Sequence, residues 1–231
     1  MKYLIANWKA NKNLQEAELW VNLLDNQLLT DTKLQEKLNS DLVKIIIAPP
    51  HPFISDLLYV LTNFRKKYPY FKNVCLAAQD ISQYDEGNYT GEDTAKSMQG
   101  LVDYTIIGHS ERRKFSAETD AVLFKKSEMA QKYNIEQIFV VRNDNDAIPN
   151  FAKMIAFEPE TSIGTGENQT LDEVINTKKK LNLPADKVFL YGGSVTHDNA
   201  SIYLRSAVIG GFLIGKASLN LDEFIGIVKS V

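Results

Sequence analysis

The chain has 231 residues, 44% of them hydrophobic and 24% charged, so it is long enough for one large α/β domain or two small domains. A formal net charge of −3 gives no long-range attraction to nucleic acid, and the cluster Lys178-Lys179-Lys180 is interpreted as a solvated helix face. The single Cys75 excludes an internal disulfide, and three histidines without a C-x-x-C or H-E-x-x-H pattern argue against a metal site.

No apolar run approaches the about 18 residues that a membrane-spanning helix needs. The apolar stretch at the N-terminus is also too short for a signal peptide, and we therefore expect a cytoplasmic protein. No Pro-, Gly- or Ser-rich linker and no charge tract divides the chain, which favours one domain over residues 1–231.

Short runs rich in Val, Ile, Leu, Phe and Tyr recur along the whole chain and predict strands. They cover residues 2–7, 43–49, 73–79, 102–108, 137–141, 153–157, 187–192 and 211–215. Amphipathic helical segments fill most of the gaps. Nearly continuous apolar strands that alternate with helices are typical of a parallel sheet covered by helices, and eight such units predict a closed (β/α)₈ barrel.

The first helical segment, residues 14–28, shows the expected spacing most clearly. Leu14, Ala17, Val21, Leu24 and Leu28 share one face, with charged residues opposite. The fifth unit departs from the pattern, because "RNDNDAIPN" at 142–150 leaves room for about two helical turns and contains a proline. We therefore expect a shortened fifth helix.

A glutamate ends the sixth apolar run. Pro159 disfavours a helical conformation at Glu158, which should sit extended at the end of its strand. A glycine-containing loop follows, and Thr170 with Glu173 predicts the start of the next helix. Taken alone, Glu158 is more simply interpreted as a solvated side chain beside a flexible loop.

The barrel changes that interpretation, since reactive groups of (β/α)₈ barrels lie at the C-terminal ends of the strands. The polar residues that follow predicted strands should converge on one mouth: Asn7, Lys9, His109, Glu111, Glu158, Ser194, Gly215 and Lys216. Each has an ordinary structural interpretation, such as a core histidine or a helix cap. Together they place a base, an electrophile, a cation and two anion cradles where one site is expected.

The two anion cradles are "GGS" after the seventh strand and "GK" after the eighth, where glycines let backbone N–H groups approach phosphate oxygens. The stretch "GGFLIGKAS" also invites comparison with a nucleotide P-loop. Ala217 stands where that motif needs Ser or Thr for magnesium, and a strand fills the supposed loop, so we reject a P-loop.

Five segments spanning the whole chain resemble the triosephosphate isomerase family in the family's order. They are "ANWKAN" at 6–11, "IIGHSERR" at 106–113, "FEPETSIGTG" at 157–166, "YGGSV" at 191–195 and "GFLIGKASL" at 211–219. The resemblance implies a TIM barrel that interconverts dihydroxyacetone phosphate and D-glyceraldehyde 3-phosphate through an enediol or enediolate. It also implies that the reaction needs no cofactor and no metal.

The same resemblance assigns roles to individual residues. Glu158 would be the base, tethered by Ser110 before a lid over 159–166 closes, and His109 would polarise the carbonyl as a neutral imidazole. Lys9 would supply positive charge, with Asn7 beside it and Glu111 holding it in place. The substrate would be bound by Asn7, Lys9, Gly164, Ser194, Gly215 and Lys216.

The resemblance further implies a homodimer, because the segment Gly87–Glu92 looks like the family's third loop, which reaches into a neighbouring subunit. We expect Arg112 to pair with Glu92 across that contact. The thin fifth unit leaves a tetramer open as the alternative. Three departures from the family pattern stand out: Glu160-Thr161 at the lid hinge, Lys216 in place of a second glycine, and "VVRND" after the fifth strand.

Two other functions stay open on the sequence: an isomerase of a different phosphosugar, and a catalytically silent barrel that binds a phosphometabolite. The "GHSERR" segment together with Glu158 argues against the first. The presence of both Glu158 and His109 argues against the second.

Overall fold

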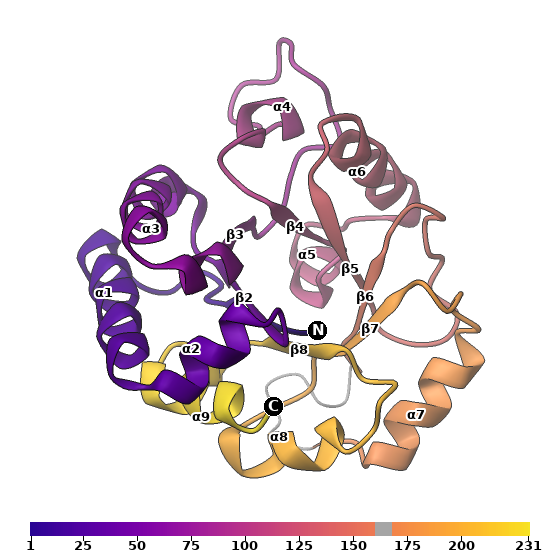
Figure 1. The fold of residues 1–231 in the computed structure, drawn as a ribbon. Helices are drawn as coiled ribbons and strands as arrows, with labels where there is room; N and C mark the ends of the chain where they lie inside the picture. Colours follow the sequence, from indigo (N-terminus) through magenta and orange to yellow (C-terminus); the bar gives the residue numbers. More distant parts are fainter. Residues whose placement is uncertain (160–167) are drawn as a thin grey trace.

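The structure is a computed structural model that describes residues 1–159 and 168–231. Parallel strands form a closed ring at its centre, with helices around the outside (Figure 1). The strands are β1 (Lys2–Asn7), β2 (Val43–Ala48), β3 (Val74–Ala78), β4 (Tyr104–Ile107), β5 (Glu136–Val141), β6 (Met154–Phe157), β7 (Val188–Tyr191) and β8 (Gly211–Ile214). The predicted (β/α)₈ barrel is therefore confirmed.

Pairing between the first and last strands closes the ring. In β1, Lys2 pairs with Val43 of β2, and Tyr3 pairs with Gly211 of β8. Every neighbouring pair is parallel, so all strand C-termini emerge at one end of the barrel. The residues that follow the strands are thus collected at that end, which is the mouth.

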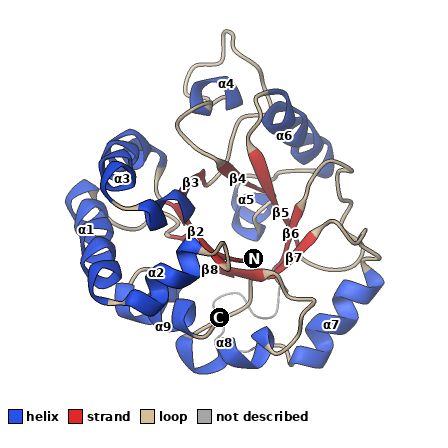
Figure 2. Cartoon of the chain, viewed as in Figure 1, coloured by secondary structure: helices blue, strands red, loops and turns tan. Residues whose placement is uncertain are grey.

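Helices surround the ring of strands, with no helix in the described residues between β5 and β6 (Figure 2). The α-helices are α1 (Leu14–Thr30), α2 (Thr32–Asn39), α3 (Ile54–Lys67), α4 (Ala95–Met98), α5 (Ser110–Phe115), α6 (Asp120–Lys132), α7 (Leu171–Lys180), α8 (His197–Leu204) and α9 (Leu221–Lys229). Short 3₁₀ helices are η1 (His51–Phe53), η2 (Pro69–Asn73) and η4 (Lys216–Ser218). Helix α7 begins as predicted, with Thr170 and Glu173 forming a capping box.

The alternation of side chains along each strand divides the core into two layers. Leu4 and Ala6 of β1 pack outward with the helices, whereas Ile5 between them packs inside the barrel with residues such as Ile46 and Cys75. Helix α1 buries Ala17, Val21, Leu24 and Leu28 against the outer layer, which confirms the face predicted for that segment. Apolar burial from both layers fixes the positions of the strand ends.

The fifth unit differs from its prediction. Residues 142–153 form turns and bends instead of the shortened helix that we expected. Asp146 folds back on Arg142, accepting from its backbone N–H at 2.7 Å and pairing with its guanidinium at 2.7 Å. These local charge-assisted hydrogen bonds compete with the helical backbone pattern, and Pro149 removes a further helical donor.

Candidate active site

The first strand positions a cation at the mouth. Asn7 is the last residue of β1, and its side-chain oxygen accepts a hydrogen bond from the Lys9 backbone N–H at 3.1 Å. Lys9 has a positive φ of 53°, an uncommon conformation for a residue with a side chain. The Gln79 side chain holds the loop by donating to the Lys9 carbonyl at 2.8 Å. Sequence reasoning missed Gln79, although it directly follows β3 and the strand-end rule applies to it.

Glu111 determines where the lysine ammonium lies. Lys9 Nζ is 2.8 Å from Glu111 Oε1, and both side chains are partly exposed. Glu111 occupies the first turn of α5, where a carboxylate is also favoured by the helix dipole. The ion pair therefore joins the ends of β1 and β4 across the mouth of the barrel.

His109 caps α5, and this contact determines its tautomer. Its Nδ1 accepts a hydrogen bond from the Glu111 backbone N–H at 3.2 Å, so Nδ1 carries no proton and the neutral ring is protonated at Nε2. Nε2 is buried and lies 3.2 Å from Glu158 Oε1, off the direct line of a hydrogen bond and without another partner among the described residues. The ring thus presents an unsatisfied donor to the mouth.

Glu158 continues the line of β6, because its backbone N–H donates to the Val141 carbonyl at 2.8 Å. Its side chain is only 6% exposed, and the Ser110 hydroxyl donates to Oε2 at 3.2 Å. Burial acts to raise the pKa of this carboxyl group, but His109, Lys9 and a backbone hydrogen bond from Ser110 outweigh it and lower the pKa below its usual value. Glu158 is therefore ionised at neutral pH, as a base must be.

Gly192, directly after β7, gives the glutamate its space. A Cβ at this position would lie 2.6 Å from Glu158 Cγ, closer than real carbon atoms approach. Sequence reasoning placed this glycine in an anion cradle and missed its contact with the carboxylate. The pattern "YGGSV" offered no signal for that contact, since it depends on the pairing of β6 with β7.

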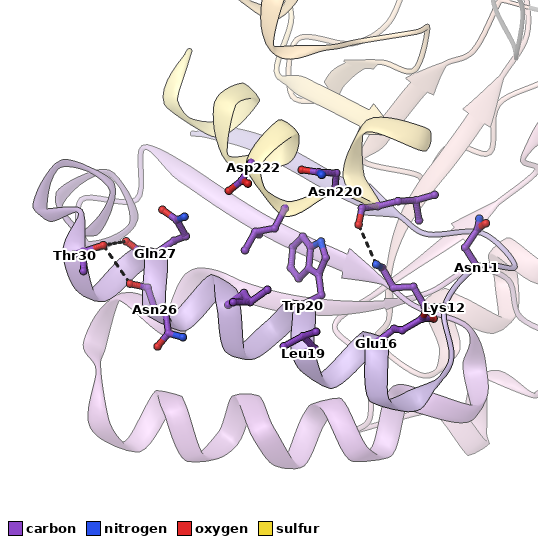
Figure 3. Close-up of a pocket in the computed structure, with 13 residues that line it drawn as sticks. Asn11, Lys12, Glu16, Leu19, Trp20, Asn26, Gln27, Thr30, Asn220 and Asp222 are labelled. Atoms are coloured by element: carbon purple, nitrogen blue, oxygen red, sulfur yellow. Dashed lines mark hydrogen bonds between the residues drawn. The ribbon is translucent and has the colours of Figure 1, made fainter.

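Four of the predicted catalytic residues line one hollow of about 380 Å³, which they share with Gln79 and Arg112: Asn7, Lys9, His109 and Glu111. Glu158 adjoins this hollow through its contact with His109. A larger hollow of about 750 Å³ runs outside the barrel between α1 and α9, and none of the predicted site residues lines it (Figure 3). Size alone is thus a poor guide to the reactive centre of this molecule.

The predicted phosphate residues lie at the ends of the next strands. Ser194 follows β7, and its carbonyl accepts a hydrogen bond from the Asn199 side chain at 3.1 Å. Gly215 follows β8, where an added Cβ would meet Lys9 Cε at 3.4 Å, and Lys216 begins η4 with an exposed side chain. These residues do not line the hollow that contains His109. The predicted phosphate contact Gly164 lies outside the described residues.

Arg112 contacts carboxylates of its own chain. Its guanidinium lies 3.0 Å from Asp80 and 2.8 Å from Glu118, and the buried Lys126 completes this charged cluster by contacting both acids. Its expected partner Glu92 accepts a hydrogen bond from Ser82 at 2.5 Å. Through Arg112, the cluster connects α5, the helix that carries Glu111, to Asp80 after β3 and to Lys126 of α6.

The geometry is suited to proton transfer at a carbon next to a carbonyl group. A buried, ionised carboxylate provides the base, the protonated Nε2 of a neutral imidazole provides a hydrogen-bond donor, and an ammonium stabilises developing negative charge. Across residues 1–159 and 168–231, no group of three His, Cys, Asp or Glu side chains is placed to hold a metal ion. The helices in the same ranges include none that is long and apolar enough to cross a membrane.

Comparison with known proteins identifies the relatives of this chain. The family profile described as triosephosphate isomerase matches residues 2–231. A triosephosphate isomerase of Mycoplasma genitalium is 32% identical over 99% of this chain and 98% of its own length. That of Mesomycoplasma hyopneumoniae strain 7448 is 34% identical over 96% of each chain. The crystal structure of the Bartonella henselae enzyme shares the fold, with a TM-score of 0.76 and 24% identity, covering 99% of this chain and 98% of that one.

Proposed function

The chain belongs to the triosephosphate isomerase family, and from that premise we propose which of its residues carry out the reaction. It is an intramolecular isomerase of glycolysis that interconverts dihydroxyacetone phosphate and D-glyceraldehyde 3-phosphate. The reaction moves one proton between neighbouring carbons and one between their oxygens. The site must therefore supply a base for carbon and a donor for oxygen.

Glu158 is the proposed base. Its carboxylate removes a proton from C1 of dihydroxyacetone phosphate and returns it to C2 of the enediol, which yields the aldehyde. In the structure the carboxylate rests between the Ser110 hydroxyl and His109 Nε2. A substrate oxygen that takes the place of the carboxylate at Nε2 would release Glu158 towards the substrate carbons.

His109 is the proposed electrophile, and the contact of its Nδ1 with the Glu111 N–H is the observation that best supports the mechanism. Because Nδ1 accepts the Glu111 N–H, only Nε2 can donate to the substrate oxygen. A neutral imidazole can also pass the proton between the two oxygens, since it gives up a proton and recovers one at the same atom. The triosephosphate isomerase family is itself the established example of a neutral histidine in this role, and His109 takes the role by its membership of that family.

Lys9 supplies fixed positive charge between the enediolate and the phosphate, and Asn7 and Glu111 hold it there. Ser194, Gly215 and Lys216 bind the phosphate, with Gly164 of the lid as a further donor. Gly215 supports this assignment, because it faces Lys9 Cε at the end of the neighbouring strand. Backbone N–H groups beside glycines suit phosphate because oxygens can approach them closely.

The test is isomerisation of glyceraldehyde 3-phosphate by the purified chain, coupled to a dehydrogenase. We expect a Glu158→Gln variant to lower kcat by about 10³-fold, since general base catalysis contributes about 10²- to 10⁴-fold. Glu128→Gln, an exposed change on α6, is the matched control. A Glu158→Gln variant as active as that control would refute the assignment of the base.

We also propose a homodimer formed through the loop Gly87–Glu92, with a tetramer as the alternative. The loop before α4 projects beyond the helical shell, and Tyr84 and Tyr89 stack there at 4.2 Å with 38% and 44% of each residue exposed (Figure 1). Exposed aromatic side chains of this kind are enriched at interfaces. Pairing of Arg112 with Glu92 across subunits stays a prediction, because Arg112 already contacts two acids of its own chain.

Light scattering of wild type and Tyr89→Ser across a dilution series tests the assembly. The mass of two chains, reduced towards one chain in the variant, would support the loop as the contact; an unchanged mass in the variant would contradict it.

We further propose that residues 1–231 act as one domain in the cytoplasm. The pairing of β1 with β8 supports the first part, since both chain ends contribute to one barrel.

A further inference from the structure

Lys12 joins two loops that are far apart in sequence. It lies between β1 and α1, and its Nζ donates a hydrogen bond to the Leu219 carbonyl at 2.9 Å, marked by a dashed line in Figure 3. Leu219 directly follows η4, the 3₁₀ helix after β8. The bond therefore connects the loop that carries Lys9 to the loop that begins with Gly215.

The backbone at Lys12 is held in an unfavourable conformation. Its φ is 72°, which a residue with a side chain rarely adopts and which glycine adopts freely. Such a conformation persists when surrounding contacts determine it. At Lys12 those contacts include the Leu219 carbonyl and the Trp8 ring, whose centroid lies 5.3 Å from Nζ, and the Glu16 carboxylate also attracts the ammonium.

From Leu219, hydrogen bonds within the loop after β8 lead back to Gly215 and Lys216 of the proposed active site. The Leu219 N–H donates to the Lys216 carbonyl at 3.1 Å, and the Ser218 N–H donates to the Gly215 carbonyl at 2.9 Å. Gly215 in turn faces Lys9, with 3.4 Å between Lys9 Cε and a Cβ built on the glycine. Covalent and hydrogen-bonded links thus run from Lys9 through Lys12 and Leu219 to Gly215, and Gly215 lies next to the Lys9 side chain where this path ends.

We propose that Lys12 is a positioning residue that sets the distance between the Lys9 ammonium and the phosphate cradle at Gly215 and Lys216. The inference rests on the proposed roles of Lys9 and that cradle. Lys12 itself does not touch the substrate. By joining the two loops it holds the cation and the backbone donors at the spacing of one phosphate-bearing ligand, which lowers the ordering required when the ligand binds.

Trp20 makes the proposal testable without unfolding the chain. Its indole N–H donates to the Ser218 carbonyl at 3.1 Å, so η4 stays attached to α1 when the Lys12 bond is removed. Lys12→Met keeps a long unbranched side chain beside Trp8 and removes the ammonium, and with it both the hydrogen bond to Leu219 and the positive charge over the ring. Lys12→Gly removes the donor and the backbone strain together, and Lys12→Arg retains a donor.

The experiment compares these variants with Lys33→Met, an exposed change on α2. The readouts are KM, kcat, thermal midpoint, and the Kd of glycerol 3-phosphate measured by calorimetry without turnover. Lys12→Met removes one charge-assisted hydrogen bond that orders the site. We therefore expect it to raise both KM and Kd by about five- to tenfold, while kcat falls by less than about threefold. Lys12→Arg should recover most of the affinity, and Lys12→Gly should weaken binding as Lys12→Met does.

Unchanged KM and Kd in Lys12→Met would overturn the proposal, and so would a lower thermal midpoint with unchanged ligand affinity, because that result assigns Lys12 a purely structural role. Restored affinity in Lys12→Gly would also overturn it, by showing that strain and not the hydrogen bond matters. Failure of the proposed role of Lys9, on which the inference rests, would appear differently, as unchanged KM and Kd in a Lys9→Met variant, whatever the Lys12 variants do.

Discussion

The two ends of the proposed active site, the reacting end at Glu158 and His109 and the phosphate end at Gly215 and Lys216, differ in how far the folded chain orders them before a ligand binds. At the reacting end, Glu158 and His109 are each 6% exposed in their side chains and lie 3.2 Å apart, with Ser110 beside them. At the phosphate end, Gly215 is partly exposed and the Lys216 side chain is exposed. The proposed reacting end is assembled from side chains in mutual contact, whereas Gly215 at the proposed phosphate end can contribute only its backbone.

The difference has a physical cause. A buried carboxylate is tolerated only with hydrogen-bond donors and positive charge around it, so the groups that keep Glu158 ionised also fix its position. Backbone N–H groups near solvent carry no such requirement, because water satisfies them until phosphate arrives. Substitutions at the reacting end should therefore change kcat, and substitutions at the phosphate end should change KM.

The largest effect should come from the histidine. His109→Gln removes the ring whose Nε2 faces the carboxylate, and we expect kcat to fall by about 10²- to 10⁴-fold with KM changed only a few-fold. Steady-state kinetics in the coupled assay measure both constants. His197→Gln on α8, which pairs with Glu223 far along the chain, is the control. A rise in KM as large as the fall in kcat would contradict the expectation that the reacting end affects kcat and the phosphate end affects KM.

A smaller effect on kcat should follow from displacing the base without removing it. Gly192→Ala places a methyl group 2.6 Å from Glu158 Cγ, so the carboxylate must shift. Misplacement of about 1 Å costs about 10²-fold, and we expect a fall in kcat of about 10- to 100-fold. The Kd of glycerol 3-phosphate should stay within a few-fold. Parallel losses in kcat and Kd would mean that Gly192 belongs to the phosphate end instead.

At the phosphate end, Ser194→Ala should act on KM. Loss of one hydroxyl contact to a charged ligand predicts a KM about tenfold higher, with kcat within about threefold of wild type. Ser201→Ala, an exposed change on α8, is the matched control. Unchanged KM would remove the Ser194 side chain from the phosphate site and leave only its backbone as a candidate.

The smallest effect concerns stability and pH. The pKa of Glu158 is lowered in the folded chain, so the ionised form stabilises the fold above the ordinary glutamate pKa, and this contribution is lost as the pH falls through the lower, folded value. We expect the difference in unfolding free energy between wild type and Glu158→Gln to be constant from neutral pH to about pH 5.5 and to shift against wild type below about pH 4.5. Denaturant titrations at several pH values measure it. A difference that instead grew in favour of wild type on acidification would show that the pKa is raised.

Local pattern was sufficient for much of this molecule. Each predicted strand run overlaps an observed strand, because apolar stretches of strand length between amphipathic helices have few other ways to bury their side chains. The rule that strand ends share one mouth also brought Lys9, Glu111, His109 and Glu158 together from positions as far as 149 residues apart, 158 minus 9. The fifth unit was predicted incorrectly, since the helical space allowed by length did not account for the pairing of Arg142 with Asp146.

The sequence by itself thus determined the order of the strands and the end of the barrel at which Lys9, His109, Glu111 and Glu158 come together. The tertiary structure alone decided which distant atoms meet: His109 Nε2 beside Glu158 Oε1, the space that Gly192 leaves for Glu158, and the bond from Lys12 to Leu219 across 207 residues. Periodicity and capping reflect interactions within a few residues, whereas these contacts exist only after the strands pair into the barrel and bring distant loops together.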